Sequence, residues 1–298
     1  MTPQDAGRAA LLRGIGWMVI AAACYASANG VVRAASADYH AFELVFVRCL
    51  IAVAVLVPAM MRSGPASWRT RRWGMHGVRA LFSVIGTTAL FVALGEMPIA
   101  DVGALIFTQP LISIVLAILV LRQQASARSW LACLAGFAGA LVILRPGFAE
   151  VSFAALLALV AAFAYACATT AIKSLSETDT TMAITVWVNV MMLPVTLVPA
   201  LFVWRTPALA DVPMLLALGA LYTFAQYAIA KGIASADARV VQPFDFLRLP
   251  FAALVGFLLF RELPDGWTWT GAVVIFAASY YALHVEAAHR RAGRRAIG

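Results

Sequence analysis

The chain has 298 residues, of which 63% are hydrophobic and 12% are charged. Because about a quarter of the residues in a soluble domain are charged, this composition excludes a soluble enzyme and indicates a membrane protein. The net charge of +8 does not indicate a nucleic-acid partner, since the basic residues are dispersed among short connections and ends. The four cysteines lie inside apolar segments without metal-ligand spacing, which predicts small core residues.

Ten apolar stretches follow one another along the chain, each with the roughly 17–25 residues needed to cross hydrocarbon. They cover residues 11–32, 42–62, 77–96, 101–121, 129–146, 152–173, 181–204, 212–234, 238–260 and 267–286. The sequence Ala35-Ser36-Ala37 resembles a signal-peptidase site, but the first stretch is long for a signal peptide and predicts a membrane helix instead. The short connections leave no room for a soluble domain.

Basic residues between the stretches predict the orientation of the chain. With the N-terminus inside, most of the Lys and Arg residues outside the helices fall on the cytoplasmic side. The opposite side holds only Arg33, Arg145, Arg205 and Arg261. The sequence therefore predicts a multi-pass protein of the cytoplasmic (inner) membrane with both termini in the cytoplasm.

Ten helices divide into two halves, residues 1–147 and 148–298. Because five is an odd number, the second half enters the membrane from the opposite side, which predicts an all-α, 5+5 inverted repeat. Residues 100–122 and 236–262 support this division, since both begin with Ala-Asp and carry a Gln-Pro a few residues later. Inverted repeats are common in secondary transporters, where the substrate site lies near the midplane between the halves.

Three stretches resemble the EamA branch of the drug/metabolite transporter superfamily. FVALGEMPIADVGALIFTQPLISIVLAILVL (Phe91–Leu121) resembles the region of helices 3 and 4, VRCLIA (Val47–Ala52) the second helix, and DFLRLPFAALVGFLLFRELPD (Asp245–Asp265) the ninth. The resemblance implies a ten-helix bundle that carries small metabolites by alternating access, with a cavity lined by helices 1–4 and 6–9. The usual Gly-Glu after helices 4 and 9 is replaced by Arg122-Gln123 and Arg261-Glu262, so these loop residues receive no role.

Two charges near the middle of the ninth stretch are the strongest site candidates. Arg248 lies about ten residues from either end, roughly 15 Å deep, and Asp245 shares its helix face at i, i+3. Such a deep charge predicts that Arg248 binds a carboxylate or phosphate of the substrate; the alternative is a structural clamp with Asp245. Asp245 could also bind a substrate ammonium or take up a coupling proton, although pairing with Arg248 would keep it ionised.

Other polar residues lie at membrane depth. Arg48, some six residues into the second stretch, either faces the cavity or has a structural role. The uncharged candidates are Tyr25, Asn29, Gln109, Tyr165, Asn189, Tyr222 and Gln226. Each one alone is more often a helix–helix hydrogen bond than a ligand contact. As a set converging on helices 1, 4, 8 and 9, they predict a substrate site that includes Tyr25, Asn29, Gln109, Tyr222 and Gln226.

The residues together predict a secondary transporter of anionic or zwitterionic metabolites, such as amino acids or related carboxylated or heteroaromatic compounds. Pro110, Pro243 and Pro250 are predicted hinges for gating, because each removes a backbone hydrogen bond. The partners expected are a small substrate and the bilayer, with a coupling proton and a homodimer left open. The alternatives are a membrane scaffold or lipid-interacting protein that transports nothing, and a channel.

Enzymatic activity is not expected. The sequence has no HExxH, GxSxG or GxxxxGK[ST] motif, and no histidine falls deep in a predicted helix. It therefore predicts no catalytic residue, no metal site and no cofactor.

Overall fold

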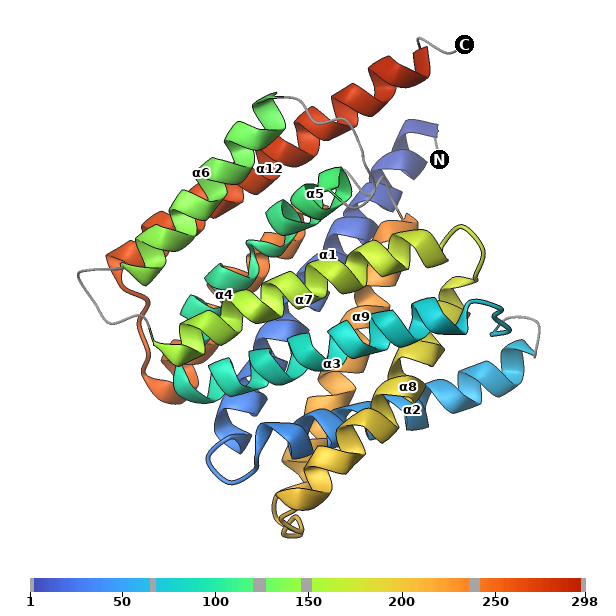
Figure 1. Cartoon of the computed structure of the whole chain (residues 1–298), viewed down its shortest axis with the longest axis vertical. Helices are drawn as coiled ribbons and strands as arrows, with labels where there is room; N and C mark the ends of the chain where they lie inside the picture. The colour runs from blue at the N-terminus through green and yellow to red at the C-terminus, as the bar shows by residue number, and fades with distance from the viewer. Residues whose placement is uncertain (1–2, 65–67, 120–126, 146–151, 236–241, 296–298) are drawn as a thin grey trace.

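A computed structural model describes residues 3–64, 68–119, 127–145, 152–235 and 242–295 (Figure 1). The described residues form helices joined by short connections, with no strand among them. The elements are α1 (Pro3–Ala35), α2 (Ala41–Ser63), α3 (Trp73–Glu96), α4 (Ile99–Ile106), α5 (Gln109–Leu119), α6 (Ala127–Leu144), α7 (Phe153–Leu175), α8 (Thr181–Phe202), α9 (Val212–Ser235), the 3₁₀ helix η2 (Gln242–Leu247), α11 (Arg248–Val255), the π-helix η3 (Gly256–Phe260) and α12 (Gly266–Arg295). The all-helical fold class is confirmed for these residues.

Polar residues set the starts of three helices. His40 precedes α2, and its side chain accepts a hydrogen bond from the backbone of Phe42, while the backbone of His40 donates to Glu43 over 3.0 Å. Ser152 and Thr180 precede α7 and α8, and each hydroxyl accepts a hydrogen bond from the backbone N–H three residues later. These caps satisfy N–H groups that the first turn of a helix cannot pair internally.

Two of the predicted spans, 101–121 and 238–260, are not continuous α-helices. The first is divided between α4 and α5 at Phe107 and Thr108, and the second passes from η2 through α11 to η3. Pro110 and Pro250 lie in the first turns of α5 and α11, where the missing N–H of proline costs no internal hydrogen bond, and Pro243 lies in η2. The prolines therefore mark where new helical segments start, and their role as gating hinges stays a prediction.

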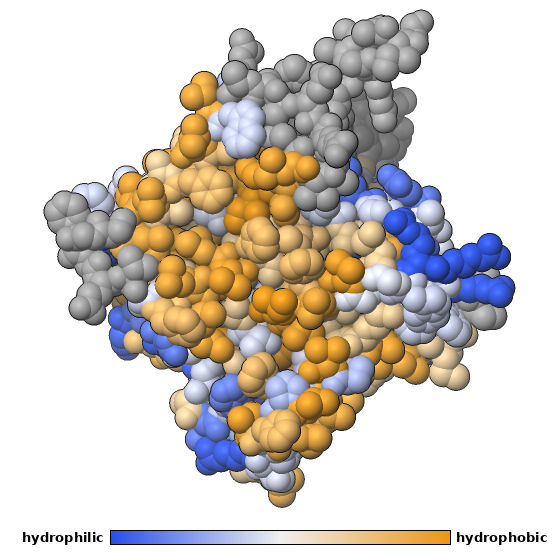
Figure 2. Space-filling model, in the orientation of Figure 1, coloured by the Kyte–Doolittle hydropathy of each residue, from blue (hydrophilic) through white to orange (hydrophobic). Residues whose placement is uncertain are grey.

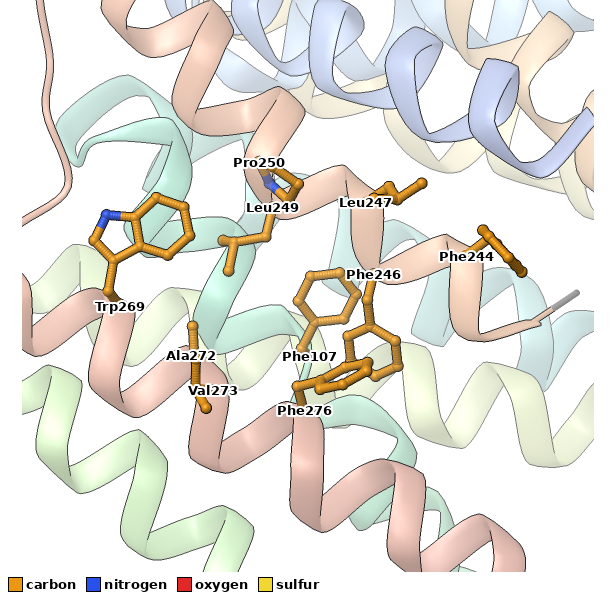
Figure 3. A pocket seen from close by; sticks show the side chains of 10 residues that line it. All are labelled: Phe107, Phe244, Phe246, Leu247, Leu249, Pro250, Trp269, Ala272, Val273 and Phe276. Carbon is orange, nitrogen blue, oxygen red and sulfur yellow. The ribbon is translucent and has the colours of Figure 1, made fainter. Parts of the chain in front are cut away.

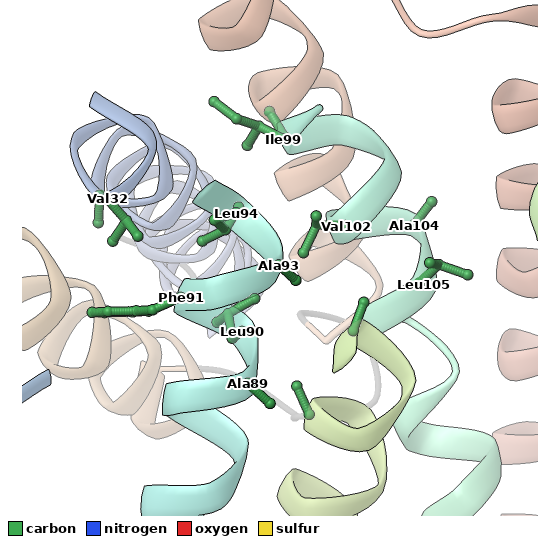
Figure 4. Packing of buried hydrophobic residues seen from close by; sticks show 14 of the residues in the cluster. Val32, Ala89, Leu90, Phe91, Ala93, Leu94, Ile99, Val102, Ala104 and Leu105 are labelled. Atoms are coloured by element: carbon green, nitrogen blue, oxygen red, sulfur yellow. The ribbon is translucent and has the colours of Figure 1, made fainter. Parts of the chain in front are cut away.

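The helices pack in pairs that are distant in the sequence. The most extensive contacts join α1 with α9, α3 with α7, α6 with α12 and α2 with α8, and α4 packs against α11. The start of α1 and the end of α12 lie at the same end of the bundle, at the upper right of Figure 1. Side chains from α1, α3 and α4 point toward one another in the core, where Phe91, Leu94, Ile99 and Leu105 are fully buried (Figure 4).

Within the described residues, seven segments are long and apolar enough to cross a membrane. They are Ala10–Ala35, Ala41–Ser63, Trp73–Glu96, Ile99–Leu116, Phe153–Leu175, Thr181–Phe202 and Val212–Ser235. Figure 2 shows a broad apolar belt across one face of the molecule, with hydrophilic side chains gathered beyond its edges. This is the surface that a bilayer requires of a multi-pass protein. The predicted boundary between the halves, at residues 147 and 148, lies outside the described residues, as do Arg122 and Gln123.

Candidate functional site

Five of the residues predicted from the sequence lie together in the middle of the bundle. Tyr25 of α1 and Tyr222 of α9 meet edge to face, with ring centroids 5.6 Å apart and planes at 77°. A guanidinium lies over each ring: that of Arg248 is 4.0 Å from the centre of Tyr25, and that of Arg48 is 5.0 Å from the centre of Tyr222. The Tyr222 hydroxyl donates a 2.6 Å hydrogen bond to Oδ1 of Asn29. We call these five residues the central cluster.

Close helix contacts bring the central cluster together. Gly219 lies one turn before Tyr222, and a Cβ at this position would come within 2.5 Å of Ile51, which lies one turn after Arg48. A Cβ at Gly30, next to Asn29, would likewise come within 2.5 Å of Val255 on α11. Only glycine allows α2 to approach α9, and α1 to approach α11, this closely.

Three residues extend the central cluster toward α3 and α7. Nη1 of Arg48 lies 3.5 Å from Oγ1 of Thr87 on α3, at the long limit of a hydrogen bond. The hydroxyl of Tyr165 on α7 donates to the same Thr87 oxygen over 3.3 Å, and Phe91 lies 5.7 Å from Tyr222 between ring centroids. Thr87 and Phe91 were not predicted as site residues, because an uncharged threonine and one phenylalanine among 17 carry no sequence signal of depth or function.

The two arginines have different electrostatic environments. Nη2 of Arg248 lies 2.7 Å from Oδ1 of Asp245, so the predicted clamp between these two residues is formed, although its angles are not those of a hydrogen bond. Both side chains remain about 30% exposed. Arg48 is only 8% exposed, and its Nε has no hydrogen-bond partner. Among the described residues, no carboxylate pairs with Arg48.

The two predicted glutamines lie apart from these contacts. Nε2 of Gln109, at the start of α5, donates a 3.1 Å hydrogen bond to Oγ1 of Thr169 on α7. Gln226 lies one turn after Tyr222 and is half-buried, and no described hydrogen bond joins it to the central cluster. Whether either glutamine contacts a substrate stays a prediction.

A separate apolar pocket lies between α12 and the η2–α11 segment (Figure 3). Its volume is about 380 Å³, and its lining includes Phe107, Phe246 and Phe276. Phe107 stacks on Phe246 with ring centroids 4.6 Å apart, and Phe276 meets Phe246 edge to face at 4.4 Å. Of the predicted site residues, the described lining contains Pro250 but none of the central cluster. This pocket offers apolar contact and no charge.

One end of the bundle is held together by Arg33 and Glu262, which the sequence analysis left without a role. Nη2 of Arg33, at the end of α1, lies 2.9 Å from Oε1 of Glu262, and both side chains are largely buried. Oε2 of Glu262 accepts a hydrogen bond from the backbone N–H of Ile99 over 3.3 Å, and Arg33 donates to the carbonyls of Leu94 and Gly95. This network joins the ends of α1, α3, α4 and η3.

Asp179 organises the other end, in the connection between α7 and α8. Its Oδ2 lies 2.6 Å from the Thr70 hydroxyl and 2.7 Å from Nε2 of His76. Burial alone would raise the pKa of Asp179, but hydrogen bonds from Thr70, His76 and Thr178 outweigh it and hold the pKa below the ordinary value of 3.8. His76 lies at the start of α3 and is fully buried, and no pattern in the sequence distinguishes it as a buried residue.

Comparison with known proteins assigns the family. The model of the EamA-like transporter family matches residues 12–145 and matches again at residues 152–283. The chain belongs to the EamA-like transporter family. The family predicted from the sequence motifs is therefore confirmed, and this EamA-like protein is a multi-pass membrane transporter, not an enzyme.

Several relatives resemble the EamA-like chain over nearly its full length. It is 36% identical over 269 residues to the riboflavin transporter of Vibrio cholerae, covering 89% of this chain and 90% of that protein. It is 32% identical to the riboflavin transporter of Rhizobium johnstonii, covering 92% of each. The S-adenosylmethionine uptake transporter of Rickettsia bellii is 26% identical, covering 92% of this chain and 94% of that protein.

A solved structure supports the fold of the EamA-like chain independently. A protein of known crystal structure superposes with a TM-score of 0.61, covering 93% of this chain and 97% of that chain at 17% sequence identity. At this identity the likeness concerns the fold alone.

Proposed function

We propose that this EamA-like transporter carries riboflavin, or a flavin closely related to it, across the cytoplasmic membrane by alternating access. Transport of a small metabolite follows from the family and its relatives. The assignment of a flavin as the substrate goes beyond the family, and the aromatic and cationic composition of the central cluster supports this assignment. The two relatives above 30% identity that bear the name riboflavin transporter point to the same substrate.

The ring system of riboflavin is flat and heteroaromatic, with one apolar edge and one edge that carries carbonyl groups. A site for it needs aromatic faces or edges for the ring and hydrogen-bonding groups for the carbonyls and the sugar-like chain. Tyr25 and Tyr222 supply the aromatic surface, and the guanidiniums of Arg48 and Arg248 place positive charge beside it. Asn29 supplies a polar group next to these rings, since its side chain is hydrogen-bonded to Tyr222. This combination is the observation on which the proposal depends.

The sequence analysis named amino acids, other carboxylated compounds and heteroaromatic compounds as substrates. The riboflavin relatives favour the heteroaromatic part of that expectation. The ion pair of Arg248 with Asp245 disfavours amino acids and plain anions as ligands bound through Arg248. A coupling proton carried by Asp245 stays a prediction.

We further propose the 5+5 inverted repeat, with residues 1–147 and 148–298 as its halves. If α1 corresponds to α7, α2 to α8, α3 to α9, α4 and α5 to the η2–η3 segment, and α6 to α12, the observed helix pairs are related by symmetry. The α1–α9 pair then corresponds to α7–α3, while α2–α8, α4–α11 and α6–α12 each join an element to its counterpart. The two family matches fall on the two halves.

In this arrangement the central cluster lies between the halves, where rocking would expose it to each side in turn. Pro110, Pro243 and Pro250 adjoin the interruptions in the helical segments, which is where bending would cost least. The distribution of Lys and Arg supports cytoplasmic termini.

Counterflow in proteoliposomes tests the proposal. Vesicles that contain the purified full chain and unlabelled riboflavin should accumulate labelled riboflavin from outside, and S-adenosylmethionine, amino acids and organic acids should compete poorly. Tyr25→Ala should reduce counterflow strongly, whereas Tyr25→Phe should retain most of it because the ring is kept. Tyr227→Ala, on the exposed surface of α9, is the matched control. Counterflow of S-adenosylmethionine without riboflavin would overturn the flavin assignment.

A further inference from the structure

Arg48 is a buried cation without a counter-charge in the described part of the chain. It is 8% exposed, its Nε makes no hydrogen bond, and its described contacts are the long approach to Thr87 and the ring of Tyr222. The carboxylate of Glu43, one and a half turns earlier on α2, already accepts hydrogen bonds from the backbones of His40 and Arg205. Nothing described on the neighbouring helices neutralises the guanidinium.

A buried arginine without a counter-charge lowers the stability of the fold unless a ligand binds to it. A buried charge normally has a partner of opposite sign or a full set of hydrogen-bond acceptors, because desolvation is otherwise not compensated. Arg248 has the opposite charge of Asp245 beside it, although its Nε also makes no hydrogen bond, whereas no described carboxylate lies beside Arg48. The unpaired Nε of Arg48 belongs to the guanidinium that lies over the Tyr222 ring, which is where an aromatic ligand would be held.

We infer that Arg48, rather than Arg248, recognises the substrate, by donating hydrogen bonds to the carbonyl edge of a flat heteroaromatic ring that packs against Tyr222 and Tyr25. The inference rests on the proposed flavin function and reverses the ranking of the two arginines that membrane depth predicted. The ligand class is defined by the dione edge that riboflavin carries. The two carbonyls of that edge flank a ring N–H, and one of them lies next to a ring nitrogen that accepts hydrogen bonds. The fork of an arginine suits this carbonyl and this nitrogen, which are two neighbouring acceptors on one plane.

This assignment makes an unusual prediction for stability. Because no described carboxylate pairs with Arg48 in the ligand-free protein, and its described hydrogen bond to Thr87 is 3.5 Å long, Arg48→Gln should leave the melting temperature of the purified full chain unchanged or raise it. A structural arginine would behave in the opposite way. Arg248→Gln is the matched comparison, and it should lower the melting temperature because it leaves Asp245 without its cation.

Binding is measured on the same purified variants through the quenching of riboflavin fluorescence. Arg48→Gln should weaken riboflavin binding by roughly 10- to 100-fold, the size expected for lost hydrogen bonds to a charged donor. Arg48→Lys, which keeps the charge but offers no planar fork, should show an intermediate loss. An analogue with a thiocarbonyl in place of a ring carbonyl is a weaker acceptor. Wild type should therefore prefer riboflavin to this analogue, and Arg48→Gln should lose that preference.

The outcomes separate the inference from the proposed function. If wild type binds riboflavin and Arg48→Gln binds it equally well, Arg48 is not the recognition residue, although the flavin function stands. If Arg48→Gln unfolds or melts at a clearly lower temperature, Arg48 is a structural residue and the inference is wrong. If wild type neither binds nor exchanges riboflavin, the proposed function itself fails.

Discussion

The turn after α1 and the turn after α7 share a pattern of backbone hydrogen bonds but differ in their side chains. In the first, the N–H of Tyr39 bonds to the carbonyl of Ala35 over 2.9 Å; in the second, the N–H of Asp179 bonds to that of Leu175 over the same distance. Tyr39 donates a 2.7 Å hydrogen bond to Asp211, just before α9, whereas Asp179 accepts bonds from residues at the start of α3.

The comparison teaches how two turns with matching backbone hydrogen bonds can differ in their side-chain contacts. The turn after α1 is bonded to the residue before α9 through a neutral donor, whereas the turn after α7 is bonded to Thr70 and His76 through a carboxylate. The first end also has the ion pair of Arg33 and Glu262. At the related position of the first half, Glu262 is replaced by Gln123, if Arg122 and Arg261 are aligned. The free energy needed to separate the helix ends should therefore differ between the two ends of the bundle.

The largest effect is expected where the ion pair is broken. Arg33→Gln should destabilise the protein by about 2–3 kcal/mol, because it leaves a largely buried Glu262 without its cation. The melting temperature in detergent measures this loss. Arg205→Gln is the control, since the Arg205–Asp38 pair is more than half exposed and should contribute less than about 1 kcal/mol. Equal losses in both variants would contradict the importance assigned to the Arg33 end.

A smaller loss is expected at the opposite end. Asp179→Asn preserves the size of the side chain but removes the charge that Thr70 and His76 contact, so it should cost about 1–2 kcal/mol. The same melting experiment measures it. A loss greater than that of Arg33→Gln would reverse the ranking of the two ends.

Acid should remove the difference between wild type and Asp179→Asn. The folded-state pKa of Asp179 is held below its ordinary value of 3.8, so its carboxylate stabilises the fold fully above that value. This contribution declines as the pH falls through the folded-state pKa, where the carboxylate becomes protonated. Melting curves of the two proteins between pH 7 and about pH 3 should therefore converge at the acid end. A constant difference would show that Asp179 acts through size or packing alone.

The smallest effect is expected at Tyr39. Tyr39→Phe removes one hydrogen bond to Asp211 and keeps the ring, so the melting temperature should fall by an amount that corresponds to about 1 kcal/mol or less. Tyr281→Phe, on the exposed surface of α12, serves as the control and should change nothing measurable. If Tyr39→Phe lowered the melting temperature as much as Asp179→Asn, the hydrogen bond of Tyr39 and those of Asp179 would contribute equally to stability despite their different charge.

Several features of the fold could be predicted because they depend on neighbouring residues alone. The apolar composition requires membrane helices, since backbone groups in hydrocarbon must be paired within the segment. The depth of Arg48, Arg248 and Asp245 marked them as site candidates, because a charge far from either helix end cannot reach water easily. The i, i+3 spacing also predicted the contact between Asp245 and Arg248, which the structure contains.

The sequence by itself thus determined the all-helical class and the family, and it marked the charged residues far from the helix ends. Only the tertiary structure decided which of them meet: Asn29 and Tyr222 are 193 residues apart, and Arg33 and Glu262 are 229 apart. Helical periodicity indicates which side chains share a face, but not which distant helix covers that face. For this reason the local contact of Arg248 with Asp245 could be predicted, whereas the position of Arg48 beside Tyr222, without a described counter-charge, could not.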